Sequence, residues 1–350
     1  MAEMTAGPAP YIYVGTRMRV RKSKLLPREE YLRMLNMSIP EITRSIEELE
    51  YKKEIDEFSS MFSGIDLLEI SLSWNLAKEF QKVLDITPGT LKEFTKAYLR
   101  RWDIQNILTI IRGKTQGIKP GKIKEILIPA GEFDTVFLDR LLAEDSPERV
   151  VEALKATKLY PVLAREFPQA LQSKSFSRLE NEMYKQYYAN LIDAARGVKG
   201  GHLFLNYISL DIDVINIRNL FRLRSDVHEE DVREMMITGG TFSIEELQRL
   251  NGITDRNEFI DALVAKIKVK PLLAALEDLR GEKPIRETET DLIKVELVQM
   301  EKMSKLNPFS IHPILVYLEK KKYEVFNLRA IARGKESRLS SDRIKEYLVM

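Results

Sequence analysis

The sequence predicts an all-α fold of three similar helical units, and two observations support this prediction. A nine-residue phrase occurs three times, as NILTIIRGK from Asn106, NIRNLFRLR from Asn216 and NLRAIARGK from Asn327. The spacings are 110 and 111 residues, and self-similarity at a fixed period is typical of a repeated supersecondary unit. Apolar residues between the phrases recur with helical period, whereas strand patterns are scarce.

The segments on either side of the phrase repeat as well. A long helical pattern precedes each copy, beginning near Leu67, Arg178 and Leu292. In the first of these, an apolar residue recurs every four positions from Leu68 to Leu84, which predicts one buried helix face. Similar segments follow the first two copies, namely KIKEILIPAGEF and DVREMMITGGTF, whereas the third offers only RIKEYLVM before the sequence stops. The third copy is therefore shorter than the other two.

The N-terminal region supplies what the third copy lacks. RMRVRKSKLLPREEYLRMLNM from Arg17 resembles the region around the phrase and the helix after it, and SIPEITRSIEELEY from Ser38 resembles SPERVVEALKATKLY from Ser146. We therefore expect the two ends of the chain to complete one unit between them, which would close a pseudo-threefold ring. The predicted units are residues 64–167, residues 176–281, and residues 285–350 together with residues 11–62.

Helix ends carry recognisable signals. Ser177 with Glu180 and Ser243 with Glu246 have the spacing of a capping box. Gly113-Lys114-Thr115 resembles the end of a phosphate-binding loop, but that loop needs a glycine five residues before Gly113, where Leu108 stands. We therefore expect a helix to end here, with Gly113 ending the turn and Lys114 complementing the helix dipole.

Composition excludes several kinds of site. The net charge of +2 is too balanced to indicate a nucleic-acid binder, and the sequence has no cysteine, so disulfides and thiolate metal sites are excluded. The histidines, His202, His228 and His312, lack a second ligand at helical spacing, so no zinc site is predicted. No cluster of catalytic groups and no cofactor site is expected. We also expect no secretory signal and no membrane-spanning helix, because charges interrupt every apolar run.

Basic residues are the remaining candidates for function. Each phrase ends in two of them, which are Arg112 and Lys114, Arg222 and Arg224, and Arg333 and Lys335. They either pair with acidic residues at the starts of the long helices and cap helix ends, or form symmetry-related docking clusters. A denser cluster lies near the N-terminus and contains Arg17, Arg19, Arg21, Lys22 and Lys24. We favour a shared framework or docking role for all of these residues.

Three segments resemble a known family, namely YIYVGTRMRVRKSKLL from Tyr11, RWDIQNILTIIRGK from Arg101, and residues 307–335. They are similar to the C subunit of archaeal A-type and bacterial V-type ATPases or ATP synthases, which resembles the d subunit of the eukaryotic V-ATPase. The resemblance implies a funnel of three similar helical domains at the foot of the central stalk. It also implies a single-copy, non-catalytic rotor component without a cofactor, peripheral on the cytoplasmic face of the cell membrane.

In that family, one side of the protein rests on the membrane proteolipid ring, which translocates protons or sodium ions, and the other receives the axle, which consists of the D and F subunits. Such a part needs stiffness, which close-packed helices supply, and no catalytic nucleophile. Two alternatives stay open: a helical-repeat scaffold that binds nucleic acid or anionic lipid through Arg17 to Lys24, and an enzyme, for which the sequence offers no pocket of titratable groups.

Overall fold

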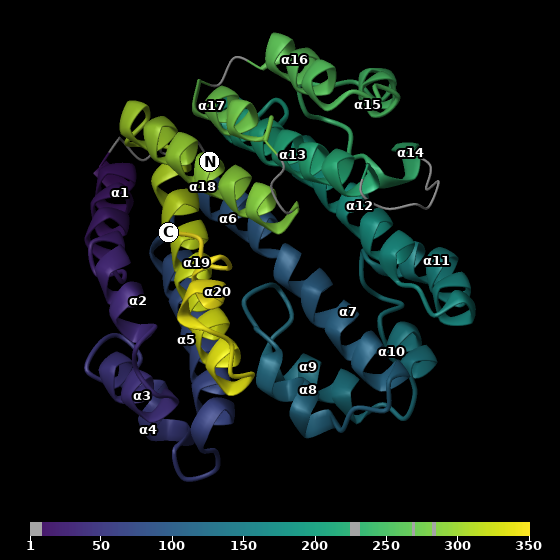
Figure 1. The fold of residues 1–350 in the computed structure, drawn as a ribbon. Coiled ribbons are helices and arrows are strands. Elements are labelled where there is room, and N and C mark those ends of the chain that lie inside the picture. The colour runs from purple at the N-terminus through teal and green to yellow at the C-terminus, as the bar shows by residue number, and fades with distance from the viewer. Residues whose placement is uncertain (1–8, 225–231, 268–269, 282–284) are drawn as a thin grey trace, which may run out of the picture.

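The computed structural model describes residues 9–224, 232–267, 270–281 and 285–350. Throughout these residues the regular structure is helical and no strand is present, which confirms the predicted all-α class (Figure 1). The repeated phrase lies within a helix each time it occurs.

The first predicted unit contains a long helix, a bent pair that carries the phrase, and four shorter helices. These are α5 (Gly64–Ile86), α6 (Gly89–Leu99), α7 (Arg101–Thr115), α8 (Pro120–Ile126), α9 (Thr135–Ala143), α10 (Pro147–Ala153) and α11 (Tyr160–Ser173). The second predicted unit follows the same order without the break between α6 and α7. Its helices are α12 (Ser177–Ala195), α13 (Gly201–Leu223), α14 (Val232–Met235), α15 (Ile244–Asn251), α16 (Arg256–Lys266) and α17 (Lys270–Asp278).

The third predicted unit draws its helices from both ends of the chain. From the C-terminal end come α18 (Ile285–Leu306), α19 (His312–Glu336) and α20 (Ser341–Lys345). From the N-terminal end come α1 (Ala9–Lys22), α2 (Arg28–Met34), α3 (Ile39–Glu47) and α4 (Lys52–Phe58). Helices α1, α2 and α3 pack along α19, and α4 packs on α5, so the first and last parts of the chain lie side by side (Figure 1).

Burial follows the apolar pattern of the sequence. On α5, Leu68, Leu72, Leu76, Phe80 and Leu84 are all buried, as their spacing predicts. One hydrophobic cluster runs from the N-terminal helices through α5 to α12 and on into α19, and a second joins α13 to α17 with the start of α18. The apolar core is therefore shared between predicted units rather than divided into three.

Two expectations about helix ends are wrong. Helix α12 begins at Ser177 itself with Phe176 as the N-cap, because the Glu180 carboxylate that a capping box would use accepts a hydrogen bond from Arg112. Helix α7 continues to Thr115, so Gly113 does not end it. Gly113 is instead buried inside the last turn, where an added Cβ would lie 2.6 Å from Ile123 of α8. The capping box of Ser243 and Glu246 on α15 is present as predicted.

Candidate functional site

The asparagine that opens each phrase makes the same pair of buried hydrogen bonds. Asn106 donates to the carbonyl oxygen of Ile128 at 2.7 Å and accepts from the Ile128 amide at 2.9 Å. Asn216 does the same with Ile237 at 2.8 and 2.9 Å, and Asn327 with Val349 at 2.8 and 2.9 Å. A primary amide offers both donor and acceptor groups, so it can satisfy both backbone groups of one residue. Each phrase helix thus fixes the segment that follows it.

An acidic residue three positions before each asparagine fixes a second segment. The Asp103 carboxylate accepts from the amides of Glu132 and Phe133 at 2.9 and 3.0 Å, just before α9. Asp213 accepts from the Thr241 amide at 2.7 Å, just before α15. Burial raises the pKa of both carboxyl groups, that of Asp103 to about 7, because water no longer solvates the charge.

In the third predicted unit the corresponding acid is Glu324, which accepts from the amide of Leu26 at 2.7 Å. Leu26 lies just before α2, so α2 stands where α9 and α15 stand in the other units. The backbone of Gly131 passes so close to Asp103, and that of Gly240 to Asp213, that an added Cβ would overlap the carboxylate. In the third predicted unit, Leu25 stands where Gly131 and Gly240 stand in the other two. Glu324, which is one methylene longer than aspartate, still reaches the backbone there.

The acidic residue contacts the start of a short helix, α9, α15 or α2, and the last basic residue of each phrase binds the end of that helix. Lys114 donates to the carbonyl oxygens of Leu142 and Glu144 at the end of α9, and Arg224 to those of Ile253 and Thr254 beyond α15. Lys335 donates to the carbonyl oxygen of Leu35 at 2.7 Å, immediately after α2. Two contacts, by Glu324 and Lys335, therefore assign α2 to the place that the sequence comparison predicts for an N-terminal helix.

Helix α1 has no counterpart in this pattern. Residues 17–37 resemble the phrase and the helix after it in sequence, but only the later part of this segment, α2, has a counterpart in the other units. The place of the phrase helix belongs to α19, and α1 packs against α19. The N-terminal segment therefore adds one helix that the other units lack.

The first of the two basic residues that end each phrase pairs with a glutamate near the start of a long helix, as one interpretation of the sequence predicts. Arg112 on α7 binds Glu180 on α12, and Arg222 on α13 binds Glu289 on α18. Arg333 on α19 donates to Glu69 on α5 at 2.6 Å. Each pair therefore joins one predicted unit to the next, and the third returns to the first. Sequence alone identifies these arginines but not the unit that each reaches.

The three pairs differ in burial. The Arg112 side chain is 38% exposed and Glu180 40%, so that pair lies near the surface. Glu69 is only 7% exposed and also lies 2.9 Å from Arg329, whose side chain is 17% exposed. Glu69 is thus the most buried carboxylate of the three pairs, since Glu289 is 16% exposed, whereas the Arg333 side chain is 57% exposed.

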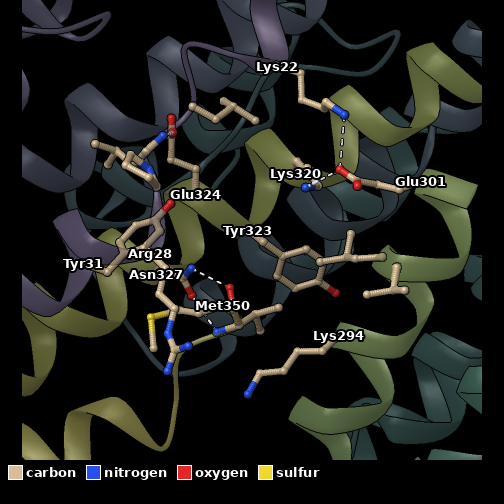
Figure 2. A pocket seen from close by; sticks show the side chains of 16 residues that line it. Lys22, Arg28, Tyr31, Lys294, Glu301, Lys320, Tyr323, Glu324, Asn327 and Met350 are labelled. Atoms are coloured by element: carbon tan, nitrogen blue, oxygen red, sulfur yellow. Dashed lines mark hydrogen bonds and ion pairs between the residues drawn. The ribbon is translucent and has the colours of Figure 1, made fainter. Parts of the chain in front are cut away.

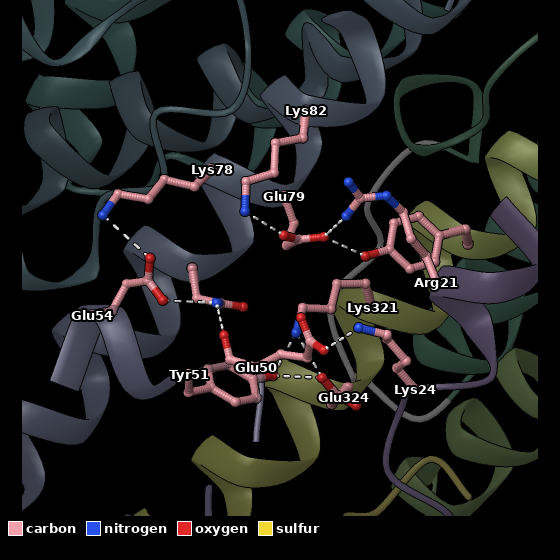
Figure 3. Close-up of polar contacts among 12 residues, drawn as sticks. Arg21, Lys24, Glu50, Tyr51, Glu54, Lys78, Glu79, Lys82, Lys321 and Glu324 are labelled. Atoms are coloured by element: carbon pink, nitrogen blue, oxygen red, sulfur yellow. Dashed lines mark hydrogen bonds and ion pairs between the residues drawn. The ribbon is translucent and has the colours of Figure 1, made fainter. Parts of the chain in front are cut away.

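The N-terminal basic cluster is dispersed around α1. Arg21 binds Glu79 of α5, and Lys24 lies 2.7 Å from Glu50 (Figure 3). Lys22 lies 3.2 Å from Glu301 of α18. Arg17 lies 5.9 Å over the ring of Tyr13, and Arg19 is exposed. Three of the five cations are therefore used inside the molecule, and nothing in their arrangement favours binding of nucleic acid or anionic lipid.

A buried polar cluster, hereafter the central cluster, joins helices of all three predicted units. The Tyr98 hydroxyl of α6 lies 3.2 Å from that of Tyr207 on α13 and donates to Glu319 on α19. Arg101 donates to Tyr98 at 2.7 Å and lies 3.4 Å from Glu319. Burial opposes ionisation of Glu319, but Lys322 and Arg101 hold its pKa below the ordinary value. Sequence reasoning missed this cluster, because no pattern in the sequence indicates that Tyr98, Tyr207 and Glu319 come together.

A second buried acid lies near the central cluster and feels the charges of Arg101 and Glu319. Glu296 of α18 is 7% exposed, and its Oε1 atom has no hydrogen-bond partner within the described part of the chain. Burial, together with the nearby charges of Asp211 and Glu319, raises the pKa of Glu296 well above its ordinary value.

The described residues contain no group of three or more His, Asp or Glu side chains suited to hold a metal ion. His312 is buried and its ring lies 3.0 Å from the Leu203 carbonyl oxygen, while His202 is exposed. His228 lies outside the described residues. In the same part of the chain, no helix combines the length and the apolar character that crossing a bilayer requires.

Comparison with known proteins identifies the family of the chain. The family model described as "ATP synthase (C/AC39) subunit" matches residues 14–347. The chain is 40% identical to the C subunit of the A-type ATP synthase of Methanosarcina acetivorans, over 98% of this chain and 94% of that protein. It is 34% identical to the proteins of the same name from Archaeoglobus fulgidus (98% and 97% covered) and Haloferax volcanii (99% of each). The resemblance seen in the sequence is confirmed, and the chain belongs to the ATP synthase (C/AC39) subunit family.

Proposed function

We propose that this chain is the socket of the central stalk in an A-type ATP synthase, a non-catalytic rotor component between the axle and the membrane ring. Its partners are the D and F subunits of the axle on one side and the proteolipid ring on the other. One copy lies at the cytoplasmic face of the membrane and couples ATP synthesis or hydrolysis to proton or sodium translocation. The 34–40% identity to C subunits of A-type ATP synthases, over nearly the whole length of each chain, supports the assignment to this complex.

The architecture that serves this role is a funnel of three units around one pseudo-threefold axis. The observation that carries the proposal is the cyclic order of the ion pairs, from α7 to α12, from α13 to α18 and from α19 back to α5. A linear array has no reason to join its last unit to its first. The central cluster, to which α6, α13 and α19 all contribute, marks where the axis would pass.

A closed ring suits a part that transmits torque. Each unit is held to both neighbours, so a twisting force on one is shared by all three instead of opening an end. Packed helical interiors transmit strain rather than absorb it. Coupling of this kind is mechanical, so no member of the central cluster needs to act on a substrate.

The test is a reconstituted complex with and without this chain. Without this chain, only the connection between the catalytic head of the complex and the membrane proteolipid ring is lost. The head should therefore still hydrolyse ATP, while ion pumping into vesicles stops. A complex that pumps at full rate without the chain would contradict the proposed role. Binding of the D and F subunits to the isolated chain, measured without nucleotide, provides a second and independent readout.

A further inference from the structure

A cleft opens in the third predicted unit where the two ends of the chain meet. Its volume is about 400 Å³, and its walls are α18, α19, the segment from Lys22 to Tyr31, and the C-terminal residues Val349 and Met350 (Figure 2). Leu25, Leu26 and Leu297 make the floor apolar. Val298 of α18 lines the same cleft and is 57% exposed, so the cleft presents apolar surface to its surroundings.

The charged side chains that line this cleft are mainly cations. They comprise Lys22, Arg28, Lys294 and Lys320 against the carboxylates of Glu301 and Glu324. Glu324 is neutralised elsewhere, because it accepts from Lys321 and Tyr51 at 2.7 and 2.6 Å. Glu301 serves both Lys22 and Lys320, Lys294 lies 3.7 Å from Asp291, and Arg28 has no ion pair with any described residue. The cleft therefore carries a positive surplus beside an apolar floor.

The first predicted unit has a cleft at the corresponding place, with a different charge. Glu289 and Glu69 correspond, because they are the partners of Arg222 and Arg333 in equivalent ion pairs. Val298 lies nine residues after Glu289 and Lys78 lies nine residues after Glu69, so Val298 and Lys78 correspond as well. The Lys78 cleft has a volume of about 480 Å³ and is lined by two lysines and three carboxylates, which are Lys78, Lys82, Asp85, Glu132 and Asp134. The positive surplus is thus a property of the third unit and does not follow from the fold.

In the second predicted unit, described residues occupy the corresponding place. Lys185, which corresponds to Lys294, donates to the Arg233 carbonyl oxygen at 3.2 Å. Gly239 lies so close to Ile192, which corresponds to Glu301, that an added Cβ would overlap that side chain. Helix α14 packs against α12 in this unit, whereas α20 packs against α19 in the third. The open cleft is therefore a feature that this architecture can close by packing.

We propose that the cleft lined by Arg28, Lys294 and Val298 docks an acidic segment of another protein of the complex, one that carries a bulky apolar side chain. The proposal rests on the proposed function, since it places the partner within the same complex. Carboxylates of the segment meet the cations at the rim, and its apolar side chain covers Leu297 and Val298. Charge complementarity of this kind selects the partner and orients it. An anionic membrane is a poorer match, because it is a flat surface and these cations surround a bounded cavity.

The test uses the whole complex with a photoreactive residue in the cleft. Val298→p-benzoylphenylalanine should cross-link to a segment rich in Asp and Glu from another protein of the complex, identified by mass spectrometry. The matched control is Lys78→p-benzoylphenylalanine in the corresponding cleft, which should not capture an acidic segment. Adding Lys294→Glu and Arg28→Glu should reduce the Val298 cross-link at least about tenfold, because both charges face the cleft, while Lys78→Glu should leave it unchanged.

Cross-links from position 298 to lipid, to a segment without acidic residues, or to nothing would overturn the proposal if the chain still co-purifies with the complex. Equal cross-linking after the double charge reversal would overturn it too. A chain that never enters the complex would instead contradict the proposed function and, with it, this inference. Circular dichroism of each variant separates loss of docking from loss of folding.

Discussion

The guanidinium of Arg333 lies 2.6 Å from the carboxylate of Glu69, although 264 residues separate them in the sequence. The same carboxylate lies 2.9 Å from Arg329, one turn earlier on α19. This contact joins the last long helix of the chain to the first helix of the first predicted unit. The Glu69 side chain is 7% exposed, against 16% for Glu289 and 40% for Glu180, so the three pairs should differ in their contribution to stability.

Glu69→Gln should destabilise the protein by roughly 2–4 kcal/mol, because two arginines would lose their counter-charge in a largely buried site. Arg222→Ala should change the free energy of unfolding by only about 0–1 kcal/mol, since its side chain is 48% exposed. Urea unfolding of both variants measures the difference. Equal effects would show that burial does not determine the strength of these contacts.

The asparagines of the phrase should matter more than the arginines. Asn216→Ala leaves the buried amide and carbonyl of Ile237 unpaired, at about 1–3 kcal/mol for each group. Asn219→Ala is the matched control on the same helix, because that half-buried side chain makes one hydrogen bond within the described residues, to the Met235 carbonyl oxygen at 2.9 Å. Thermal unfolding should show the larger decrease for Asn216→Ala, and the reverse order would contradict the role assigned to this hydrogen-bond pair.

Two glycines should resist substitution for a steric reason. Gly131→Ala would force the Asp103 carboxylate away from the Glu132 and Phe133 amides, and Gly240→Ala would displace Asp213 from Thr241. Both variants should unfold at lower temperature than the parent. Gly121→Ala is the control, because an added Cβ there meets no atom within 4 Å. A melting temperature of Gly131→Ala equal to that of Gly121→Ala would show that the loop can move without loss.

Asp103 should make stability depend on pH in a defined direction. Its pKa is about 7 in the folded protein and 3.8 in the reference state, so the folded state binds the proton more tightly. This contribution to stability is fully present below about pH 4 and is lost as pH rises through 7. The difference corresponds to about 4 kcal/mol.

Urea unfolding of the parent should therefore show stability falling between about pH 4 and 7, and Asp103→Asn should flatten that part of the profile. Asp139→Asn, at an exposed ion pair with Lys124, serves as control and should keep the parent profile. A parent profile that rises over this range would exclude a dominant role for Asp103.

Helix content and the repeated phrase could be predicted from sequence, because they depend on local periodicity and on similarity between segments. The similarity also indicated the place of α2, but not the additional helix α1. The acids Asp103, Asp213 and Glu324 were missed, although a signal was present: each lies three residues before a phrase asparagine. The replacement of Asp by Glu in the third copy obscured it. Comparing all three copies position by position would have found them.

Other features depend on the assembled chain and have no local signal. The partner of Arg333 is fixed by how the last helix meets the first long one, which no periodicity encodes. Glu296 and Glu319 lie on polar-patterned helices and become buried only where three helices converge. The same limit explains the false capping box at Ser177, since Glu180 suits either a local cap or a distant arginine.

The shared third unit also sets an order of events during synthesis. Lys335 binds the carbonyl oxygen of Leu35 across 300 residues, and ribosomes add about 5–20 residues per second. Helices α2 and α3 therefore leave the ribosome about 15–60 s before the part of α19 against which they pack. During that interval the apolar side chains of Tyr31, Met34 and Ile42 have no α19 surface to cover them, so the segment made first is among the last to reach its native contacts.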